Sequence, residues 1–186
     1  MNGMNGDDAV AVIGALFASE GADEYLGEAV TQASHMLQAA ALAERAGAGD
    51  ELIAAALLHD VGHFSGTLTG HDLMRGTDTR HGEAGAAWLG RWFGEQVTEP
   101  VRLHVAAKRY LCAVEPEYAA GLSPASVYTL GVQGGPMRGR ELAEFAGHRF
   151  AEAAIRVRRW DDAAKDPQVE PPPFDHFAPV LRALAK

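Results

Sequence analysis

The chain has 186 residues, of which 47% are hydrophobic and 22% are charged, and its formal net charge is −9 at pH 7. This length is enough to close one hydrophobic core, and the composition is typical of a soluble globular protein. The negative charge argues against sequence-independent binding to nucleic acid, which depends on neutralising phosphates. The apolar runs are too short to span a membrane, and we expect no signal peptide. The single cysteine, Cys112, rules out an internal disulfide and fits a reducing cytoplasm.

Hydrophobic residues at helical spacing predict two helices in the first quarter of the chain. The first covers residues 9–18. The second covers residues 32–46, with Thr31 as its N-cap and Gly47 at its end. His35 falls on the apolar side of this second helix and so points to the core. A single histidine in such a place is more often a hydrogen-bonded core residue than a metal ligand, so His35 alone identifies no site.

The third predicted helix ends in an adjacent histidine and aspartate. It contains the apolar run 52–58, which Asp50 is expected to cap, and Gly62 is expected to end it in the left-handed conformation. His59 and Asp60 would then lie on the last turn of a short buried helix. An imidazole and a carboxylate are costly to bury without a partner. The pair therefore indicates a bound cation.

After residue 63 the sequence predicts a loop and then helices only. Residues 64–80 are rich in Gly and Thr with little periodicity, and are expected to form a covering loop. The remaining helices are predicted at residues 81–93, 98–114, 124–133, 139–146, 150–164 and 174–185. His104 and Lys108 share a helix face, as do Arg158 and Asp161. Because no strand-like alternation occurs, we predict an all-α single domain.

Six side chains in these helical settings are suited to binding metals: His35, His59, Asp60, His81, His104 and Asp161. They come from five helices whose inward faces must converge in a compact bundle. Four histidines and two carboxylates exceed what one tetrahedral zinc site uses, and a carboxylate can bridge two cations. Imidazole together with carboxylate suits iron, manganese or zinc, and the lack of thiolates argues against an iron–sulfur cluster.

The order of these ligands, H…HD…H…H…D, resembles that of the HD-domain metal proteins, an all-α family. The doubled histidines His81 and His104 mark its dinuclear branch. Further stretches resemble the PhnZ-type HD oxygenases of phosphonate breakdown: Tyr25-Leu26-Gly27-Glu28 and residues 103–112, 122–126, 133–137 and 158–165. The resemblance therefore implies one HD domain over residues 1–186, with its core at about 25–165 and a C-terminal helical extension at 174–185.

The resemblance implies a mixed-valent Fe(II)/Fe(III) diiron dioxygenase. Such an enzyme uses O2 as co-substrate to cleave the carbon–phosphorus bond of an α-hydroxyphosphonate, giving a carboxylic acid and phosphate. The six ligands would hold the two iron ions, with Asp60 bridging them. The expected substrate is (R)-2-amino-1-hydroxyethylphosphonate, which gives glycine, or its N-trimethyl analogue. A hydroxymethylphosphonate-like substrate without the amine stays open as a third choice.

The resemblance also implies roles for residues around the irons. Tyr25 would occupy the open coordination position until substrate displaces it, and Glu28 would receive the cationic amino end of the substrate. Lys108 and Arg158 each share a helix face with a metal ligand, so two cations would face the phosphonate dianion. Further substrate contacts are expected from His63, Ser126 and Gln133. The expected catalytic residues are Tyr25, Glu28 and Lys108.

Two other functions are compatible with parts of the sequence. The first is an HD-type phosphohydrolase that acts on a nucleotide or phosphomonoester through a metal-activated water. The second is a binding module that keeps its metals for structure only. Two features argue against the hydrolase: the segment with Tyr25 and Glu28, and the set of Lys108, Gln133 and Arg158. The six intact ligands argue against the binding module. We therefore expect a cytoplasmic enzyme for a small organophosphonate, without nucleic acid or membrane partners, as a monomer or small homo-oligomer.

Overall fold

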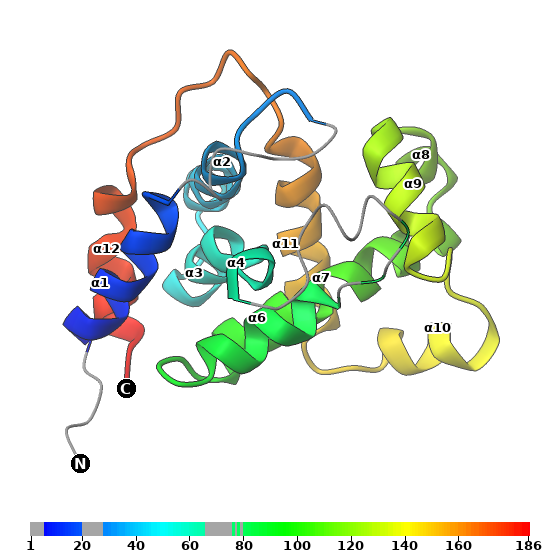
Figure 1. Ribbon diagram of the computed structural model, residues 1–186. Helices are drawn as coiled ribbons and strands as arrows, with labels where there is room; N and C mark the ends of the chain where they lie inside the picture. Colours follow the sequence, from blue (N-terminus) through cyan, green and yellow to red (C-terminus); the bar gives the residue numbers. More distant parts are fainter. Residues whose placement is uncertain (1–5, 20–27, 66–75, 77, 79) are drawn as a thin grey trace.

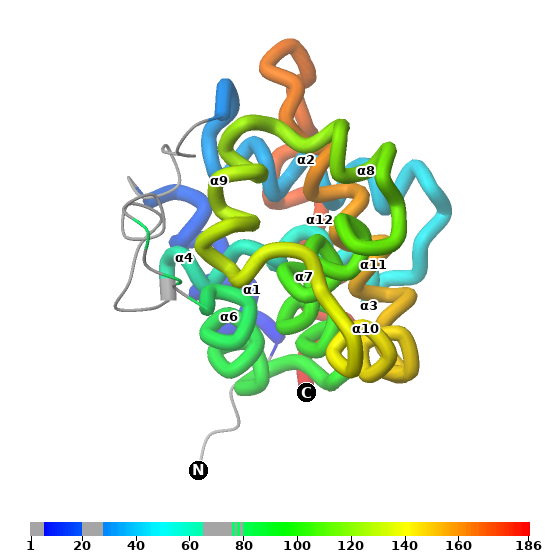
Figure 2. Tube along the Cα trace, turned by 90° about the vertical axis from the view of Figure 1, so that its right-hand side faces the viewer, coloured from blue at the N-terminus to red at the C-terminus, as the bar shows by residue number. Residues whose placement is uncertain are grey.

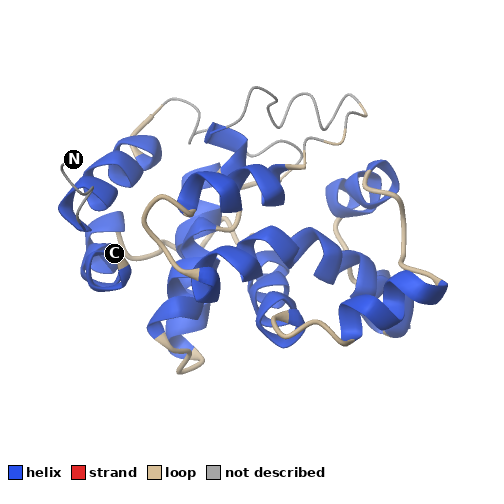
Figure 3. Ribbon diagram, turned by 90° about the horizontal axis from the view of Figure 1, so that it is seen from below, coloured by secondary structure: helices blue, strands red, loops and turns tan. Residues whose placement is uncertain are grey.

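The computed structural model describes residues 6–19, 28–65, 76, 78 and 80–186, and all regular elements within these ranges are helices (Figure 1). In chain order they are α1 (Gly6–Phe17), α2 (Gln32–Arg45), α3 (Asp50–Leu58), α4 (Gly62–Ser65), α6 (His81–Leu89), α7 (Glu95–Val114), α8 (Pro116–Ala120), α9 (Pro124–Val132), α10 (Gly139–Ala146), α11 (Ala151–Ala163) and α12 (Phe174–Leu184). Seen from below and coloured by secondary structure, the described residues show helix and loop only (Figure 3). The predicted all-α fold class is confirmed.

The bundle is arranged around α7, which has 20 residues. Helices α3, α6 and α11 contact α7, and α2 contacts both α3 and α11. Helices α1 and α12 pack on each other at one side of the molecule, and α12 also contacts α3 (Figure 1). Helices α8, α9 and α10 lie at the opposite side, which faces the viewer in Figure 2. No helix within the described ranges is long and apolar enough to cross a membrane.

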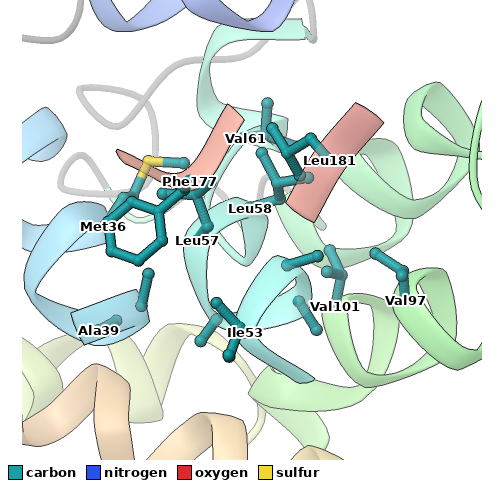
Figure 4. Close-up of a cluster of buried hydrophobic side chains, with 14 of the residues drawn as sticks. Met36, Ala39, Ile53, Leu57, Leu58, Val61, Val97, Val101, Phe177 and Leu181 are labelled. Atoms are coloured by element: carbon teal, nitrogen blue, oxygen red, sulfur yellow. The ribbon is translucent and has the colours of Figure 1, made fainter. Parts of the chain in front are cut away.

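The main hydrophobic core lies between α1, α2, α3, α7 and α12. Leu57, Leu58 and Phe177 are among its large, fully buried side chains (Figure 4). Helices α2 and α3, which contact each other, are instead rich in buried alanine, at residues 39–41 and 54–56 among others. Small side chains let helix backbones approach closely. This explains how the ends of α2 and α3 bring their histidines together.

The His-Asp segment differs from the prediction in two details. The N-cap of α3 is Gly49, and Asp50 is the first helical residue rather than the cap. Gly62 does not have a positive φ and begins α4 instead of ending α3 in the left-handed region. The reason for glycine here is a close approach, because a Cβ at Gly62 would lie 1.9 Å from the carbonyl oxygen of His81. Gly62 thus allows α4 to touch the start of α6.

Replacing Gly62 by alanine is expected to push α4 and α6 apart and to lower the free energy of unfolding by about 1–3 kcal/mol, the usual cost of overpacking. Because α6 begins with His81, the change should also weaken metal binding. Urea unfolding and metal content after purification measure both effects. Gly131→Ala in α9 is the matched control, since a Cβ there meets no atom within 4 Å. Equal stability of the two variants would contradict the close-approach explanation.

Several helix boundaries differ from the sequence prediction. Thr31 and Ser123 are N-caps as expected from their side chains and positions, each accepting a hydrogen bond from a backbone N–H three residues on. Helix α7 begins earlier than expected, at Glu95, and contains Pro100 inside it. The short helix α8 was not predicted. Of the predicted loop 64–80, the first two residues belong to α4 and most of the rest lies outside the described residues.

Candidate metal centre and active site

The six predicted metal ligands converge in the interior of the bundle. They are His35 of α2, His59 and Asp60 at the end of α3, His81 of α6, His104 of α7 and Asp161 of α11. Each of the six is 5% exposed or less. Polar side chains buried to this extent need partners, so these residues have to bind one another or a cation.

Asp60 lies between two pairs of histidines. Its Oδ2 atom is 3.7 Å from Nε2 of His35 and 3.6 Å from Nε2 of His59. Its Oδ1 atom is 3.4 Å from Nε2 of His81 and 3.5 Å from Nε2 of His104. Within each pair the two Nε2 atoms are 3.0 Å apart. The result is two groups of metal-binding atoms that share one carboxylate, with each oxygen facing a different group.

Asp161 adds a second carboxylate to one of these groups. Its Oδ1 is 3.4 Å from Nε2 of His35, and its Oδ2 is 3.8 Å from Nε2 of His59. Among the described residues, the group of His81 and His104 has only the shared carboxylate besides its two imidazoles. Two histidines and one carboxylate leave open coordination positions on a non-haem metal. This second group is therefore where other molecules have room to bind.

The imidazole orientations fit a metal. Nδ1 of His35, His59 and His104 lies 2.9, 2.8 and 2.7 Å, respectively, from a backbone carbonyl oxygen, to which it can donate. We therefore assign the lone pair to Nε2, the atom that faces the shared carboxylate. Two such lone pairs 3.0 Å apart, as in the pair of His35 and His59, repel each other unless a metal cation or a proton lies between them. The donor set is that of a metal centre.

Burial sets the charges of the centre. It lowers the pKa of His59 to about 4 and that of His81 to about 3, so both imidazoles are neutral at pH 7 and can bind metal. Burial by itself would raise the pKa of Asp60, but the surrounding histidines, His59 foremost, hold it well below its usual range because they are themselves protonated at the low pH where Asp60 titrates. For His35 the hydrogen bond and charge of Asp161 outweigh burial and raise the pKa. A proton held on His35 would leave when metal binds.

Two polar side chains orient the carboxylates of the centre. Gln32 donates from Nε2 to Oδ2 of Asp60 at 3.0 Å. Arg158 donates from Nη1 to Oδ2 of Asp161 at 2.6 Å. Burial would raise the pKa of Asp161, but the charge of Arg158 outweighs it and keeps the pKa well below the usual range. Both carboxylates are thus held ionised and in fixed orientations, as metal ligands require.

The guanidinium of Arg158 has further partners on its other edge. Its Nε lies 2.9 Å from Oδ2 of Asp162 and 3.0 Å from the hydroxyl of Tyr118, and Nη2 also contacts Asp162. The Tyr118 hydroxyl in turn donates to Asp162. Arg158 was expected to face a phosphonate. The structure places it in a network with the phenol of Tyr118 and the carboxylates of Asp161 and Asp162. Of these, Asp161 is a candidate metal ligand.

Lys108 is a buried cation near the centre that, among the described residues, bonds to a neutral group. It is 2% exposed, and its Nζ donates to Oγ1 of Thr129 at 3.0 Å. Burial, together with the positive charge of Arg158, lowers its pKa to about 7. Desolvated ammonium groups bind anions strongly, because little water competes for them.

Of the other expected substrate contacts, His63 touches the centre, whereas Ser126 and Gln133 belong to α9 and its C-cap. Ser126 and Gln133 are buried, and Oε1 of Gln133 has no hydrogen-bond partner among the described residues. His63 stacks on His81 with ring centroids 4.1 Å apart, and its Nε2 is 3.9 Å from Oδ1 of Asp60. Nδ1 of His63 likewise has no partner in the described part of the chain. These atoms are polar groups that a ligand can satisfy.

Glu28 lies beside Lys165, a residue that was not expected in the site. Nζ of Lys165 is 2.9 Å from Oε1 of Glu28 and donates to Oγ of Ser126 at 3.1 Å. The hydroxyl of Ser123 donates to the same Oε1 at 2.6 Å. Tyr25, the other residue expected from this segment, lies outside the described residues.

Comparisons with known proteins agree with this geometry. The family model described as HD domain matches residues 33–125. The chain is 45% identical over 181 residues to the [1-hydroxy-2-(trimethylamino)ethyl]phosphonate dioxygenase (glycine-betaine-forming) of Leisingera caerulea, covering 97% of this chain and 92% of that protein. It is 46% identical over 153 residues to the hydroxymethylphosphonate dioxygenase of Gimesia maris, covering 81% of this chain and 75% of that protein. An uncharacterized protein of Acanthamoeba polyphaga mimivirus is 33% identical over 168 residues, covering 89% of this chain and 77% of that protein.

The chain belongs to the HD-domain family. Within it, the protein is a PhnZ-type enzyme, as its motifs predicted. Sequence reasoning brought all six candidate ligands of this HD-domain protein together, but it missed several residues that contact the ligands or the expected substrate-binding residues. These are Gln32, Tyr118, Thr129, Asp162 and Lys165. Asp162 and Lys165 stand in the stretch that carries the resemblance, which was the one available signal.

Arg158→Met in this HD-domain enzyme is expected to destabilise the metal-free protein more than the metal-loaded one. Two carboxylates lose their cation, and breaking a buried ion pair costs about 3 kcal/mol or more. A bound metal would itself compensate Asp161, so part of the loss should be recovered when Mn²⁺ is added. Urea unfolding with and without Mn²⁺ measures the difference.

Arg159→Met is the matched control for this change. Arg159 is the next residue along α11, but its ion pair with Glu115 is exposed. Removing an exposed pair changes stability by about 0–1 kcal/mol. A loss in Arg158→Met that Mn²⁺ leaves unchanged would show that Arg158 does not act through Asp161.

Proposed function

We propose that this enzyme is a mixed-valent diiron dioxygenase that cleaves the carbon–phosphorus bond of an α-hydroxyphosphonate with O2. The observation that carries the proposal is the position of Asp60, whose two oxygens face two separate pairs of histidines. The dioxygenase names of two relatives support the same reaction. With hydroxymethylphosphonate as the simplest case, the substrate dianion and O2 give formate, hydrogen phosphate and a proton.

Iron is proposed because of the donor set. His81, His104 and the shared Asp60 form a group of two histidines and one carboxylate, which is typical of non-haem iron oxygenases. The second iron would be held by His35, His59, Asp60 and Asp161. When bound, the irons supply the one-electron chemistry that lets O2 react with a carbinol carbon.

The chain's own residues would bind and orient the substrate. We assign the phosphonate to Lys108, whose desolvated ammonium lies near the centre, together with Ser126, Gln133 and His63. Arg158 remains a proposed phosphonate contact only through its remaining N–H groups, because most of its donors are already bound to Asp161 and Asp162. Tyr25 would fill the open coordination position before substrate arrives.

The far end of the substrate is assigned to Glu28. The carboxylate contacts Ser123 and Lys165 at the start of α9, and Lys108 contacts Thr129 about one turn further along the same helix. The sequence placed (R)-2-amino-1-hydroxyethylphosphonate first and its N-trimethyl analogue second. The Leisingera relative, which matches 97% of this chain, is named for the trimethylamino compound. We therefore propose a cationic substrate of this pair and would test the trimethylammonium compound first.

Further proposals concern the molecule as a whole. We propose one HD domain over residues 1–186, supported by the packing of α12 into the same core as α1 and α3. We propose a cytoplasmic location because the chain has a single cysteine, Cys112. We also propose a monomer or small homo-oligomer that acts on a small molecule.

Phosphate release from the iron-loaded protein tests the function directly. We expect phosphate from α-hydroxyphosphonates only when O2 is present, with one O2 consumed per phosphate. The carboxylic acid formed should be glycine betaine from the trimethylammonium compound and glycine from the primary amine. Phosphate released under argon from nucleotides or phosphomonoesters would instead assign the protein to the hydrolase class.

A further inference from the structure

The carboxylate of Glu28 is already neutralised by a side chain of the protein. Its Oε1 accepts hydrogen bonds from the ammonium of Lys165 at 2.9 Å and from the hydroxyl of Ser123 at 2.6 Å. The side chains of Lys165 and Glu28 are only 13% and 12% exposed. An ion pair with so little exposure is weakly screened by water, so its partners hold each other firmly. Any other cation that binds Glu28 must compete with Lys165.

A chain of contacts on one side of α9 joins this pair to the phosphonate end of the site. Lys165 also donates to Oγ of Ser126 at 3.1 Å. One turn further along α9, Thr129 donates to the carbonyl of Ser126 at 3.2 Å and accepts from Lys108 at 3.0 Å. The two lysines, of which Lys108 is buried and Lys165 half-buried, thus mark two ends of one polar strip. One end is bound to a carboxylate, and the other is bound to a neutral hydroxyl.

We propose that Lys165 is a specificity-determining residue that occupies, on Glu28, the place of the cationic group of the substrate. This inference rests on the proposed function and deepens it. A substrate with a cationic far end has to exchange with the ammonium of Lys165, whereas a substrate without an amine leaves the pair intact. The pair therefore lowers the preference for cationic substrates relative to neutral ones, and specificity is such a difference of affinities.

The two cationic substrates should differ in how well they make this exchange. A primary ammonium can replace both the charge and the hydrogen bond that Lys165 gives to Glu28. A trimethylammonium group replaces the charge alone, because it has no N–H to donate. Lys165 should therefore discriminate most strongly against the trimethylammonium substrate, less against the primary amine, and not at all against hydroxymethylphosphonate.

The test compares Lys165→Met with the wild-type enzyme on all three phosphonates. Met keeps the length of the side chain and removes its charge. Because charged hydrogen bonds correspond to about a tenfold effect or more on affinity, we expect kcat/KM for the trimethylammonium substrate to rise about tenfold relative to that for hydroxymethylphosphonate. The primary amine should show a smaller rise. Calorimetric binding of the analogues that lack the α-hydroxyl, measured without turnover, should show the same order.

Three further variants complete the test. Lys165→Arg keeps the charge and should keep the wild-type ratios. Glu28→Gln should lower the ratio of cationic to neutral substrate, and adding Lys165→Met to it should change the ratio no further, since the two residues act as a pair. If Lys165→Met does not fold, as judged by circular dichroism, Lys165→Gln replaces it, because the amide can still donate to Ser126.

Two results would overturn the inference. If Lys165→Met lowers kcat/KM for all three phosphonates by the same factor, Lys165 binds the phosphonate group rather than guarding Glu28. If the ratios between substrates do not change, Lys165 has no part in specificity. Failure of the proposed function is a separate outcome, because the wild-type enzyme would then release no phosphate from any phosphonate in air.

Discussion

Asp60→Ala is expected to abolish metal binding and activity together. In the described part of the chain, Asp60 is the residue whose carboxylate faces both pairs of histidines, so its loss removes a ligand from each metal position at once. Bound metal contributes several kcal/mol to lowering the barrier, so activity should fall by more than about a thousandfold. Iron per chain, measured by elemental analysis, and O2-dependent phosphate release are the two readouts.

Asp50→Ala is the matched control for this prediction. Asp50 is an exposed aspartate in the first turn of the same helix, α3. It interacts with the helix dipole only, which is worth about 0.3–1 kcal/mol. The control should therefore keep its iron and its activity. An Asp60→Ala protein that also kept both would disprove the ligand assignment.

The candidate ligands could be found from the sequence because each one is fixed by local rules. The spacing of apolar residues places His35 and His104 on the inward faces of their helices, and the apolar run before His59 buries the pair that follows it. Such faces must meet in an all-α protein of this size. The helix faces predict that these side chains point inward, and the resemblance to the HD-domain proteins joins them into one site.

The supporting contacts could not be found in this way because they join residues far apart in the chain. Glu28 and Lys165 are separated by 137 positions, and Arg158 and Tyr118 by 40. No periodicity predicts which of several inward-facing polar groups meet across such distances. Arg158 shows the consequence. Its helix face was predicted correctly, but its neighbours Asp161 and Asp162 bind most of its donors.

Gly62 shows a second limit of sequence reasoning. A glycine after a helix is usually explained by a left-handed turn, and that was the interpretation here. The actual constraint is the carbonyl of His81, which belongs to a helix that begins 19 positions later in the chain. Close approaches of this kind depend on tertiary packing. The sequence indicates that a glycine is present, and only the packing explains why.

Lys108→Met is expected to weaken phosphonate binding about ten- to a hundredfold, the range for a hydrogen bond to a charged group. Lys108 is the cation near the centre whose bond is to a neutral hydroxyl, that of Thr129. The variant should fold, because replacing a buried charge by an apolar side chain of similar length is seldom destabilising. Calorimetry with an unreactive phosphonate that lacks the α-hydroxyl measures the affinity.

The same variant should remove a pH dependence of phosphonate binding. Burial and the charge of Arg158 lower the pKa of Lys108 to about 7, so its ammonium is lost as the pH rises through neutrality. Affinity in the wild type should therefore fall above pH 7, and bound metal cations would move this fall to lower pH. In Lys108→Met only the titration of the phosphonate itself should remain.

Arg102→Met is the matched control, because it alters a surface ion pair with Glu99 on the same helix. It should leave both the phosphonate affinity and its pH profile unchanged. Wild-type affinity and profile in Lys108→Met would exclude Lys108 as the phosphonate contact and leave Arg158 as the cation to test.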